Sequence, residues 1–376
     1  MLRTNSNENL RRVHNRAINS LSTASTFSPF IPASHPAAPA MEYFKRLAGV
    51  VDDVLLQRFH CASLPTRAVD AITEDVTGKT IIVTGPTSGI GITTARALAK
   101  RGARVILACR TTSKGDALVD EWRRESEVLK TKAPDCRVMR LDLDSLESVK
   151  AFAKTFRASE ERLDVLINNA GIFDMSGAYV TSKDGREQHL QSNFLAPVLL
   201  TMELLEELKK TGSQTGDARV VFVSSKLHEL CGGLRLDDMD FKRHRYGAQA
   251  AYASSKLAEV MFVRALDARL KSKAPGTRAM SLHPGNIVTG VVRTLPKFVQ
   301  VLYKLIMSRI LLTPDQGARC SLFCATRREA IEGDVDGPYF TSACERRAPS
   351  HQALDDAASE ELWKYTLSEL GLEDPL

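Results

Sequence analysis

The sequence lacks the patterns that mark several large classes of protein. Its seven cysteines include no CxxC pair. An odd, scattered set of this kind indicates reduced thiols, so we expect neither a disulfide framework nor a metal site. Aromatic residues make up only 6% and the basic residues form no block, which argues against a nucleic-acid partner. No apolar run reaches the ~18 residues that a membrane-spanning helix needs.

Short apolar segments alternate with helical segments through most of the chain. The strand-like segments are KTIIVTG, ARVILACR, CRVMRLDL, LDVLINNAG, ARVVFVSS and TRAMSLHPG. Apolar strands separated by helices are typical of a parallel sheet that is covered on both faces. The sequence therefore predicts an α/β fold, a Rossmann-like doubly wound sheet in a single domain over residues 78–345. A tail with a short helix follows at 346–376.

Two segments precede this domain. Residues 1–40 contain four arginines and one acid, a composition that fits an organelle transit peptide or a disordered tail equally well. A transit peptide would direct the protein to a plastid or mitochondrion; otherwise it would be cytoplasmic or membrane-associated. Met41 could also be the true start. In the lead-in at 41–77, apolar residues recur at helical spacing at Phe44, Leu47, Val51, Leu55 and Phe59. We predict that this stripe packs on the domain; the alternative is a helix lying on a membrane.

The stretch TGPTSGIG, residues 84–91, closes the first predicted strand and opens the first helix. Glycines there let the backbone turn sharply and approach a phosphate, and the helix N-terminus presents unpaired N–H groups to that anion. The strand before and the helix after supply the context that a lone glycine motif lacks. The cofactor-binding residues predicted in this stretch are Gly85, Thr87, Ser88, Gly89, Ile90 and Gly91.

The end of the second strand indicates which dinucleotide binds. An NAD site carries an acid there, whereas this chain has Arg110. A guanidinium can bind a 2′-phosphate through two hydrogen bonds, so we predict NADP(H) over NAD(H). After the third strand, Asp142 and Leu143 are placed to meet the adenine. Asp142 could equally cap the helix that begins near Ser145.

Two further turns complete the predicted cofactor site. The turn NNAG follows the fourth strand and contributes Asn169, Ala170 and Gly171. Its asparagines could also serve only to tie strand ends together. The turn HPGNIVT follows the sixth strand, and we expect its Pro284, Gly285 and Thr289 to lie against the nicotinamide amide.

Tyr252 and Lys256 are four residues apart in a predicted helix and so share one face. An ammonium ~4 Å from a phenol would stabilise the phenolate by ~4 kcal/mol at an effective dielectric of 20. That would bring the tyrosine pKa from about 10 toward neutrality, where a general acid or base works best. Ser225, at the tip of the fifth strand, could hold the substrate oxygen. Asn193 could hold a water that relays protons to Lys256.

In combination, these motifs resemble the short-chain dehydrogenase/reductase superfamily from Gly78 to beyond Phe340. The resemblance implies that Asn193, Ser225, Tyr252 and Lys256 form a catalytic tetrad and that Lys256 also holds the nicotinamide ribose. VILACR, LINNAGIF, SKLAEVMF and LHPG resemble the retinol dehydrogenase and WW-domain oxidoreductase group. EQHLQSNFLAPVLL and LTPDQGARCSLFCAT are similar to plant FOREVER YOUNG-type oxidoreductases. These relatives imply lipophilic alcohols or carbonyls, such as retinoids or polyprenols, as substrates, and a homodimer formed through long helices.

We therefore expect hydride transfer between nicotinamide and a carbonyl or alcohol carbon. The apolar segment 295–312 lies where this fold carries a substrate lid; it either lines an apolar pocket and touches a membrane, or is an ordinary lid helix. The main rival is a redox-sensing or scaffold protein that binds NADP(H) with little turnover. A sugar-nucleotide epimerase fits less well, because the C-terminal region is short for its substrate domain.

Overall fold

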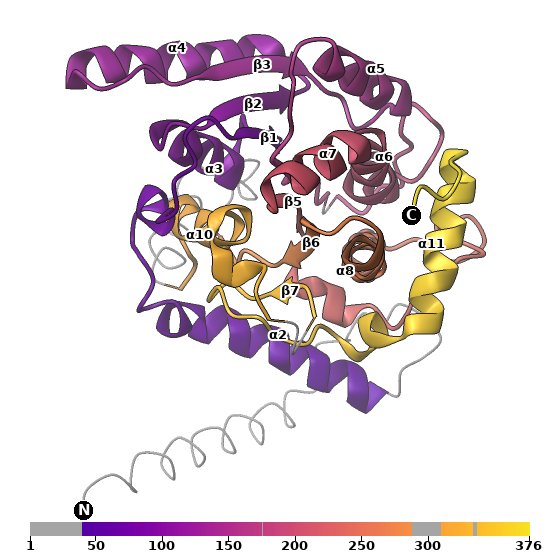
Figure 1. Cartoon of the computed structure of the whole chain (residues 1–376). Helices are drawn as coiled ribbons and strands as arrows, with labels where there is room; N and C mark the ends of the chain where they lie inside the picture. Colours follow the sequence, from indigo (N-terminus) through magenta and orange to yellow (C-terminus); the bar gives the residue numbers. More distant parts are fainter. Residues whose placement is uncertain (1–39, 175, 288–309, 334–336) are drawn as a thin grey trace, which may run out of the picture. The chain divides into compact units, whose positions relative to one another are not determined.

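The computed structural model describes residues 40–174, 176–287, 310–333 and 337–376. Its centre is a seven-stranded parallel sheet in the order β3-β2-β1-β4-β5-β6-β7 (Figure 1). The strands are β1 (Thr80–Thr84), β2 (Arg104–Cys109), β3 (Cys136–Arg140), β4 (Val165–Asn168), β5 (Ala218–Val223), β6 (Thr277–Leu282) and β7 (Tyr339–Phe340). The predicted doubly wound α/β fold is confirmed.

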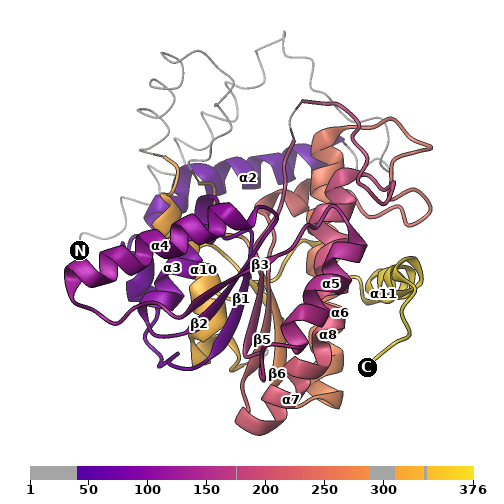
Figure 2. The same ribbon diagram turned by 90° about the horizontal axis from the view of Figure 1, so that it is seen from above.

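Helices cover both faces of the sheet, as Figure 2 shows. One face carries α3 (Gly89–Lys100), α4 (Thr112–Leu129) and α10 (Pro314–Thr326). The other carries α5 (Leu146–Arg157), the π-helix η2 (Leu190–Leu195), α6 (Ala196–Glu203), α7 (Leu205–Thr215) and α8 (Ala248–Lys273). The shorter elements are η1 (Ala68–Ala71), η3 (Lys226–Leu230), η5 (Arg328–Ala330) and η6 (His351–Leu354).

The strands are apolar on both sides because both sides are covered. In β1, Ile82 packs into the cluster of α5, α6 and α8, while Ile81 and Val83 pack into the opposite cluster with α3 and α10. Successive side chains in a strand point to opposite faces, so an uninterrupted apolar run is what a doubly covered strand requires. The C-terminal helix α11 (Asp356–Leu370) joins the first cluster, where Trp363 stacks on Phe262 of α8 at 5.0 Å.

The helix α2 (Ala40–His60) contacts the domain through a different face from the predicted one. Val50 and Gln57 are its buried residues, whereas Val51 is 47%, Leu55 57% and Phe59 79% exposed. The helix therefore packs on the domain through Val50 and Gln57, while most of the apolar stripe, which was expected to face the domain, faces outward. In the described part of the chain, no helix is both long and apolar enough to cross a bilayer.

Candidate active site at the carboxyl edge of the sheet

The loop between β1 and α3 is shaped by glycines. Gly85 has φ +64°, a left-handed conformation that favours glycine. At Gly91 a Cβ atom would lie 2.2 Å from the Gly85 carbonyl oxygen and 2.6 Å from the Asn169 amide nitrogen. No side chain fits there, so Gly91 lets the first turn of α3 lie directly against the loop.

The turn after β4 is locked to the end of β1. The Thr84 hydroxyl accepts hydrogen bonds from the backbone N–H groups of Asn169, at 3.0 Å, and Ala170, at 2.9 Å. The Asn169 side-chain amide donates a hydrogen bond of 2.8 Å to the Thr84 carbonyl. Asn169 thus ties two strand ends together, as one of the two sequence interpretations held. Residues 84–91 and 169–171 together are called the phosphate end below.

The N-terminus of α3 suits an anion. Its N-cap residue, Ser88, makes no side-chain capping bond, and the first turn contains no acid. The Gly91 N–H donates to the Ser88 carbonyl at 3.1 Å, and the remaining N–H groups of that turn and the positive end of the helix dipole are left for a ligand. A Cβ atom at Gly89 would meet nothing within 4 Å, so there is open space beside this backbone. These features fit the pyrophosphate of a dinucleotide.

Asp142, which the sequence predicts to meet the adenine, is buried. Its carboxylate accepts from the Lys183 ammonium at 2.5 Å and from the Asp144 N–H at 3.3 Å. Burial favours the protonated acid, but Lys183, the Asp144 N–H and Arg110 outweigh burial and lower the pKa of Asp142. The N-cap of α5 is Ser145, whose hydroxyl accepts from Ser148 N–H at 3.3 Å. The interpretation of Asp142 as that cap is wrong.

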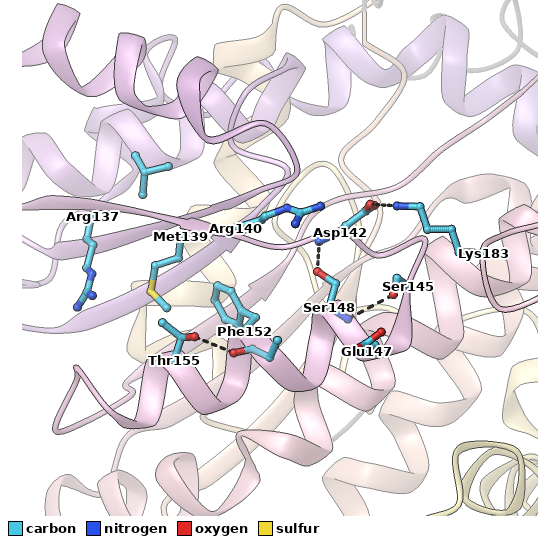
Figure 3. Close-up of a pocket in the computed structure, with 12 residues that line it drawn as sticks. Arg137, Met139, Arg140, Asp142, Ser145, Glu147, Ser148, Phe152, Thr155 and Lys183 are labelled. Atoms are coloured by element: carbon cyan, nitrogen blue, oxygen red, sulfur yellow. Dashed lines mark hydrogen bonds and ion pairs between the residues drawn. The ribbon is translucent and has the colours of Figure 1, made fainter.

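A groove of about 590 Å³ adjoins this region (Figure 3). It lies between the edge strand β3 and α5, with Met139 and Phe152 among its lining residues. Asp142 is the one predicted cofactor residue in its lining, and Tyr252 and Lys256 are not part of it. The groove therefore lies beside the residue predicted to meet the adenine and does not include the Tyr252–Lys256 pair.

Tyr252 and Lys256 lie on the same face of α8, as the spacing predicts. The Lys256 nitrogen is 5.8 Å from the centroid of the Tyr252 ring. Phe173 stacks on that ring at 4.3 Å, and the His189 ring meets its edge at 6.1 Å. Packing on two sides thus fixes the phenol beside the ammonium.

Lys256 is buried and held by two acceptors. Its ammonium donates to the Val223 carbonyl at 3.0 Å and to the Glu259 carboxylate at 2.7 Å. Burial alone favours the neutral amine, but Glu259 and the Tyr252 phenol outweigh burial and raise the pKa of Lys256. Burial raises the pKa of the Glu259 carboxyl, and Lys256 and the Ser224 hydroxyl oppose that rise. Sequence reasoning missed Glu259.

Asn193 sits in the π-helix η2, a type of distortion common at functional sites. Its side chain accepts from Ile172 N–H at 2.8 Å and donates to the Ile172 carbonyl at 3.1 Å and to Ser255 at 3.0 Å. Both amide hydrogens are therefore used within the protein. A Cβ atom at Gly171 would lie 3.4 Å from both the Asn193 side-chain oxygen and the Lys256 nitrogen, so the fold brings these two groups together around Gly171.

Ser225 follows β5 and begins η3, where its hydroxyl accepts from Leu227 N–H at 3.2 Å. It is half-buried, whereas Ser224 is buried and donates to the Lys256 carbonyl at 2.9 Å. This difference favours Ser225 as the serine that meets substrate, which stays a prediction. Asn193, Ser225, Tyr252 and Lys256 are called the catalytic end below.

The turn after β6 is clamped by a residue of α2. Gly285, with φ +81°, precedes Asn286, whose N–H donates to the Gln57 side chain at 2.7 Å. Gln57 in turn donates to the carbonyls of Asn286 at 3.2 Å and Ile310 at 3.1 Å. Gln57 is wholly buried, and sequence reasoning missed it. Gln57 follows Val50 and Val54 at helical spacing, and this pattern could have shown that it lies on the same face of the helix as they do.

Part of the predicted site lies outside the described residues. This holds for Thr289 and for most of the predicted lid at 295–312. The base of that segment is described: Leu312 N–H donates to the Asn286 carbonyl at 2.9 Å, and Arg58 donates to the Leu311 carbonyl at 3.1 Å. In the described part of the chain, no cluster of His, Cys, Asp or Glu could hold a metal ion.

Comparison with known proteins agrees with this geometry. A family model described as short chain dehydrogenase matches residues 79–233. The Arabidopsis thaliana dehydrogenase/reductase SDR family member FEY is 36% identical over 342 residues, covering 88% of this chain and 88% of that protein. Human retinol dehydrogenase 12 is 39% identical over 295 residues, 78% of this chain and 87% of that protein. A solved structure from Mycobacterium paratuberculosis has a TM-score of 0.61 and 32% identity, and covers 82% of this chain and 98% of its own.

Proposed function

This chain belongs to the short-chain dehydrogenase/reductase family and is an NAD(P)-dependent oxidoreductase, and from this premise we propose that it reduces or oxidises a lipophilic carbonyl or alcohol with NADP(H). The observation that carries the assignment of the chemistry is the pair on α8, a buried ammonium 5.8 Å from the centroid of the Tyr252 ring. The bound nicotinamide would supply or accept the hydride.

Each member of the catalytic end has a distinct task. Tyr252 gives or takes the hydroxyl proton, because the neighbouring ammonium stabilises its phenolate. Ser225 orients the substrate oxygen beside Tyr252. Asn193 holds the Ile172 backbone and Ser255 in place next to Lys256. A relay of protons through a water at Asn193 stays a prediction.

The mechanism is tested by Tyr252→Phe. We expect turnover to fall at least about 100-fold, since a general acid or base contributes 10²–10⁴-fold, while cofactor affinity stays within about twofold. NADPH absorbance with a panel of aldehydes, ketones and retinoid or polyprenol alcohols measures the first, and quenching of protein fluorescence the second. Tyr365→Phe, which removes a phenol oxygen on α11 that pairs with Arg186, is the matched control. A Tyr252→Phe enzyme with unchanged kcat contradicts the mechanism.

The preference for NADP(H) is supported by the end of β2. Arg110 follows Cys109 directly and is exposed, and no acid occurs between Val105 and Thr111. A free guanidinium there suits a 2′-phosphate, which an acid would repel.

A lipid surface is the proposed source of substrate. The retinol dehydrogenases that this chain resembles are named for a lipophilic alcohol. The outer face of α2 exposes Met41, Phe44, Val51, Leu55 and Phe59. Through Gln57 and Arg58 the same helix is hydrogen-bonded to the base of the predicted lid. An exposed apolar helix face joined to the base of the predicted lid is suited to shallow insertion between lipid headgroups.

Sedimentation with vesicles tests this surface. With phosphatidylcholine vesicles containing anionic lipid, we expect the wild type to pellet and Leu55→Glu with Phe59→Glu to stay in the supernatant. Val128→Glu, a charge added at an exposed apolar residue of α4, should pellet like the wild type. A wild-type protein that never pellets contradicts membrane contact. The homodimer stays a prediction that sedimentation velocity checks.

A further inference from the structure

We propose that Glu259 is a positioning residue of the catalytic lysine, the counter-ion that keeps the buried Lys256 ammonium charged and directed toward Tyr252. This proposal rests on the proposed roles of Tyr252 and Lys256. Glu259 lies in the stretch SKLAEVMF, and the sequence patterns assigned it no role.

The geometry is that of an enclosed ion pair. Glu259 lies one helical turn after Lys256, and the two side chains are 3% and 4% exposed. The Lys256 nitrogen is 2.7 Å from the Glu259 carboxylate and 3.0 Å from the Val223 carbonyl. A lysine ammonium has three N–H donors, so these two bonds leave one for a partner on the side of Tyr252.

The order along α8 gives the pair a direction. Lys256 is one turn from Tyr252, and Glu259 is two turns away. The pair is therefore a dipole whose positive end lies nearer the phenol. A charge of this sign close to the phenol favours phenolate, and the more distant carboxylate weakens that effect only in part.

The Glu259 carboxylate stabilises the charged form of Lys256, which burial alone would destabilise. An ammonium without a counter-ion in such surroundings loses its proton, and buried lysines can titrate several pH units below their usual range. A neutral amine would give Tyr252 no electrostatic help. Burial lowers the pKa of Lys256, and Glu259 raises it more than Tyr252 does.

The neighbouring elements supply mostly neutral groups. From the end of β5 come the Val223 carbonyl and the Ser224 hydroxyl, and from η2 comes the Asn193 amide. The His189 ring, paired with Glu187, faces Tyr252 rather than Lys256. Among the described residues that act on Glu259, Lys256 is the charged one.

The first experiment reads the lysine directly, without a substrate. In protein labelled with ¹³C-lysine, the Lys256 side-chain resonance is assigned by its loss in Lys256→Met. In the wild type we expect the ammonium form to persist to a higher pH than that of an ordinary lysine, because Glu259 and Tyr252 raise the pKa of Lys256. In Glu259→Gln, an isosteric change without charge, we expect the titration midpoint to fall by at least about one pH unit. An unmoved midpoint overturns the proposal.

Two further variants make the result specific. Glu259→Asp keeps the charge and should restore most of the midpoint. If Glu259→Gln does not fold, Glu259→Met, a second change without charge, replaces it and should lower the midpoint in the same way. Asp267→Asn is the matched control, because Asp267 is also a buried acid of α8 but pairs with Arg278 and Lys271. Its loss should lower stability and leave the Lys256 midpoint in place.

The pH dependence of kcat/KM then links the lysine to catalysis. In Glu259→Gln the activity should disappear at lower pH on the basic side than in the wild type, and Glu259→Asp should recover it. A moved lysine midpoint in a protein that turns over no substrate would leave this inference standing and remove the proposed function. A normal lysine midpoint and a normal pH profile in an active Glu259→Gln enzyme would overturn this inference and leave the proposed function standing.

Discussion

The phosphate end and the catalytic end are built by different means. The phosphate end consists of backbone: glycines that let α3 approach the loop, and Thr84 bonded to the N–H groups of the next turn. The catalytic end consists of buried side chains, with Lys256 held by Glu259 and Asn193 held by Ile172 and Ser255. The first should be sensitive to added volume, and the second to changes in charge and pH.

Gly91→Ala should have the largest effect. Its Cβ atom would lie 2.2 Å from the Gly85 carbonyl oxygen, so the start of α3 must move away from the loop. We expect NADPH affinity to fall at least about 1000-fold, or about 4 kcal/mol. Fluorescence titration measures it. Gly49→Ala in α2, where a Cβ atom meets nothing within 4 Å, should bind as the wild type does. Normal affinity of Gly91→Ala for NADPH would contradict the expectation that the phosphate end is sensitive to added volume.

Acid should destabilise the protein through two histidines near the catalytic end. Burial lowers the pKa of His228 to about 4 and of His283 to about 3. The unfolded chain therefore takes up protons first as the pH falls below about 6.5, and stability that is complete above that pH is lost as it falls toward 4. At pH 5 the two together should cost about 4 kcal/mol.

Urea unfolding at pH 7.5 and pH 5 measures this loss. His283→Leu should show about half of the wild-type difference between the two pH values. His351→Ala, a change at an exposed histidine, should show all of it. The phosphate loop, residues 84–91, has no ionisable side chain and adds nothing to this effect.

Gln57→Ala tests whether α2 belongs to the working domain. Removing the side chain leaves the N–H of Asn286 and the carbonyls of Asn286 and Ile310 without their partner. The expected cost is about 3 kcal/mol in the free energy of unfolding, with a higher KM for substrate. Leu56→Ala, on the exposed side of the same helix, should change stability by less than about 0.5 kcal/mol. Equal losses of stability in Gln57→Ala and Leu56→Ala would show that the hydrogen bonds of Gln57 do not stabilise the fold.

Arg110→Ala should have the smallest effect. Loss of one guanidinium from a 2′-phosphate should raise the KM for NADPH about tenfold to thirtyfold and leave the KM for NADH unchanged. Lys114→Ala, a change at a nearby exposed cation in α4, is the control. Equal constants for the two cofactors in the wild type would remove the inference from Arg110.

The same contrast explains what the sequence could predict. Strands covered on both faces are continuous apolar runs, and a phosphate loop is a local pattern of glycines, so both were visible in single stretches. Tyr252 and Lys256 were visible because helical spacing alone places them together. Glu259 lies three residues after Lys256, so helical spacing also places these two side chains together. The burial of the pair depends on β5 and η2, which no local pattern reveals.

The face of α2 was misjudged for a related reason. Apolar spacing identified a helix but could not tell which side meets the domain, because the inner side contains the polar Gln57 and the outer side contains Leu55 and Phe59. Likewise, Ser145 rather than Asp142 caps α5, and Lys183, some forty positions further along, occupies the Asp142 carboxylate. Partners far apart in sequence decided the face of α2 and the pairing of Asp142, whereas the cap of α5 is a local bond between Ser145 and Ser148.

Gln57 bonds to both Asn286 and Ile310, and Leu312 bonds to Asn286, so the described residues before 288 and after 309 meet at one point. Adding residues between two points of a chain that are already joined costs little free energy. Substitutions or insertions between these points need not disturb α8. Substrate range could therefore diversify in descendants of this protein while the proton-transfer machinery is inherited intact.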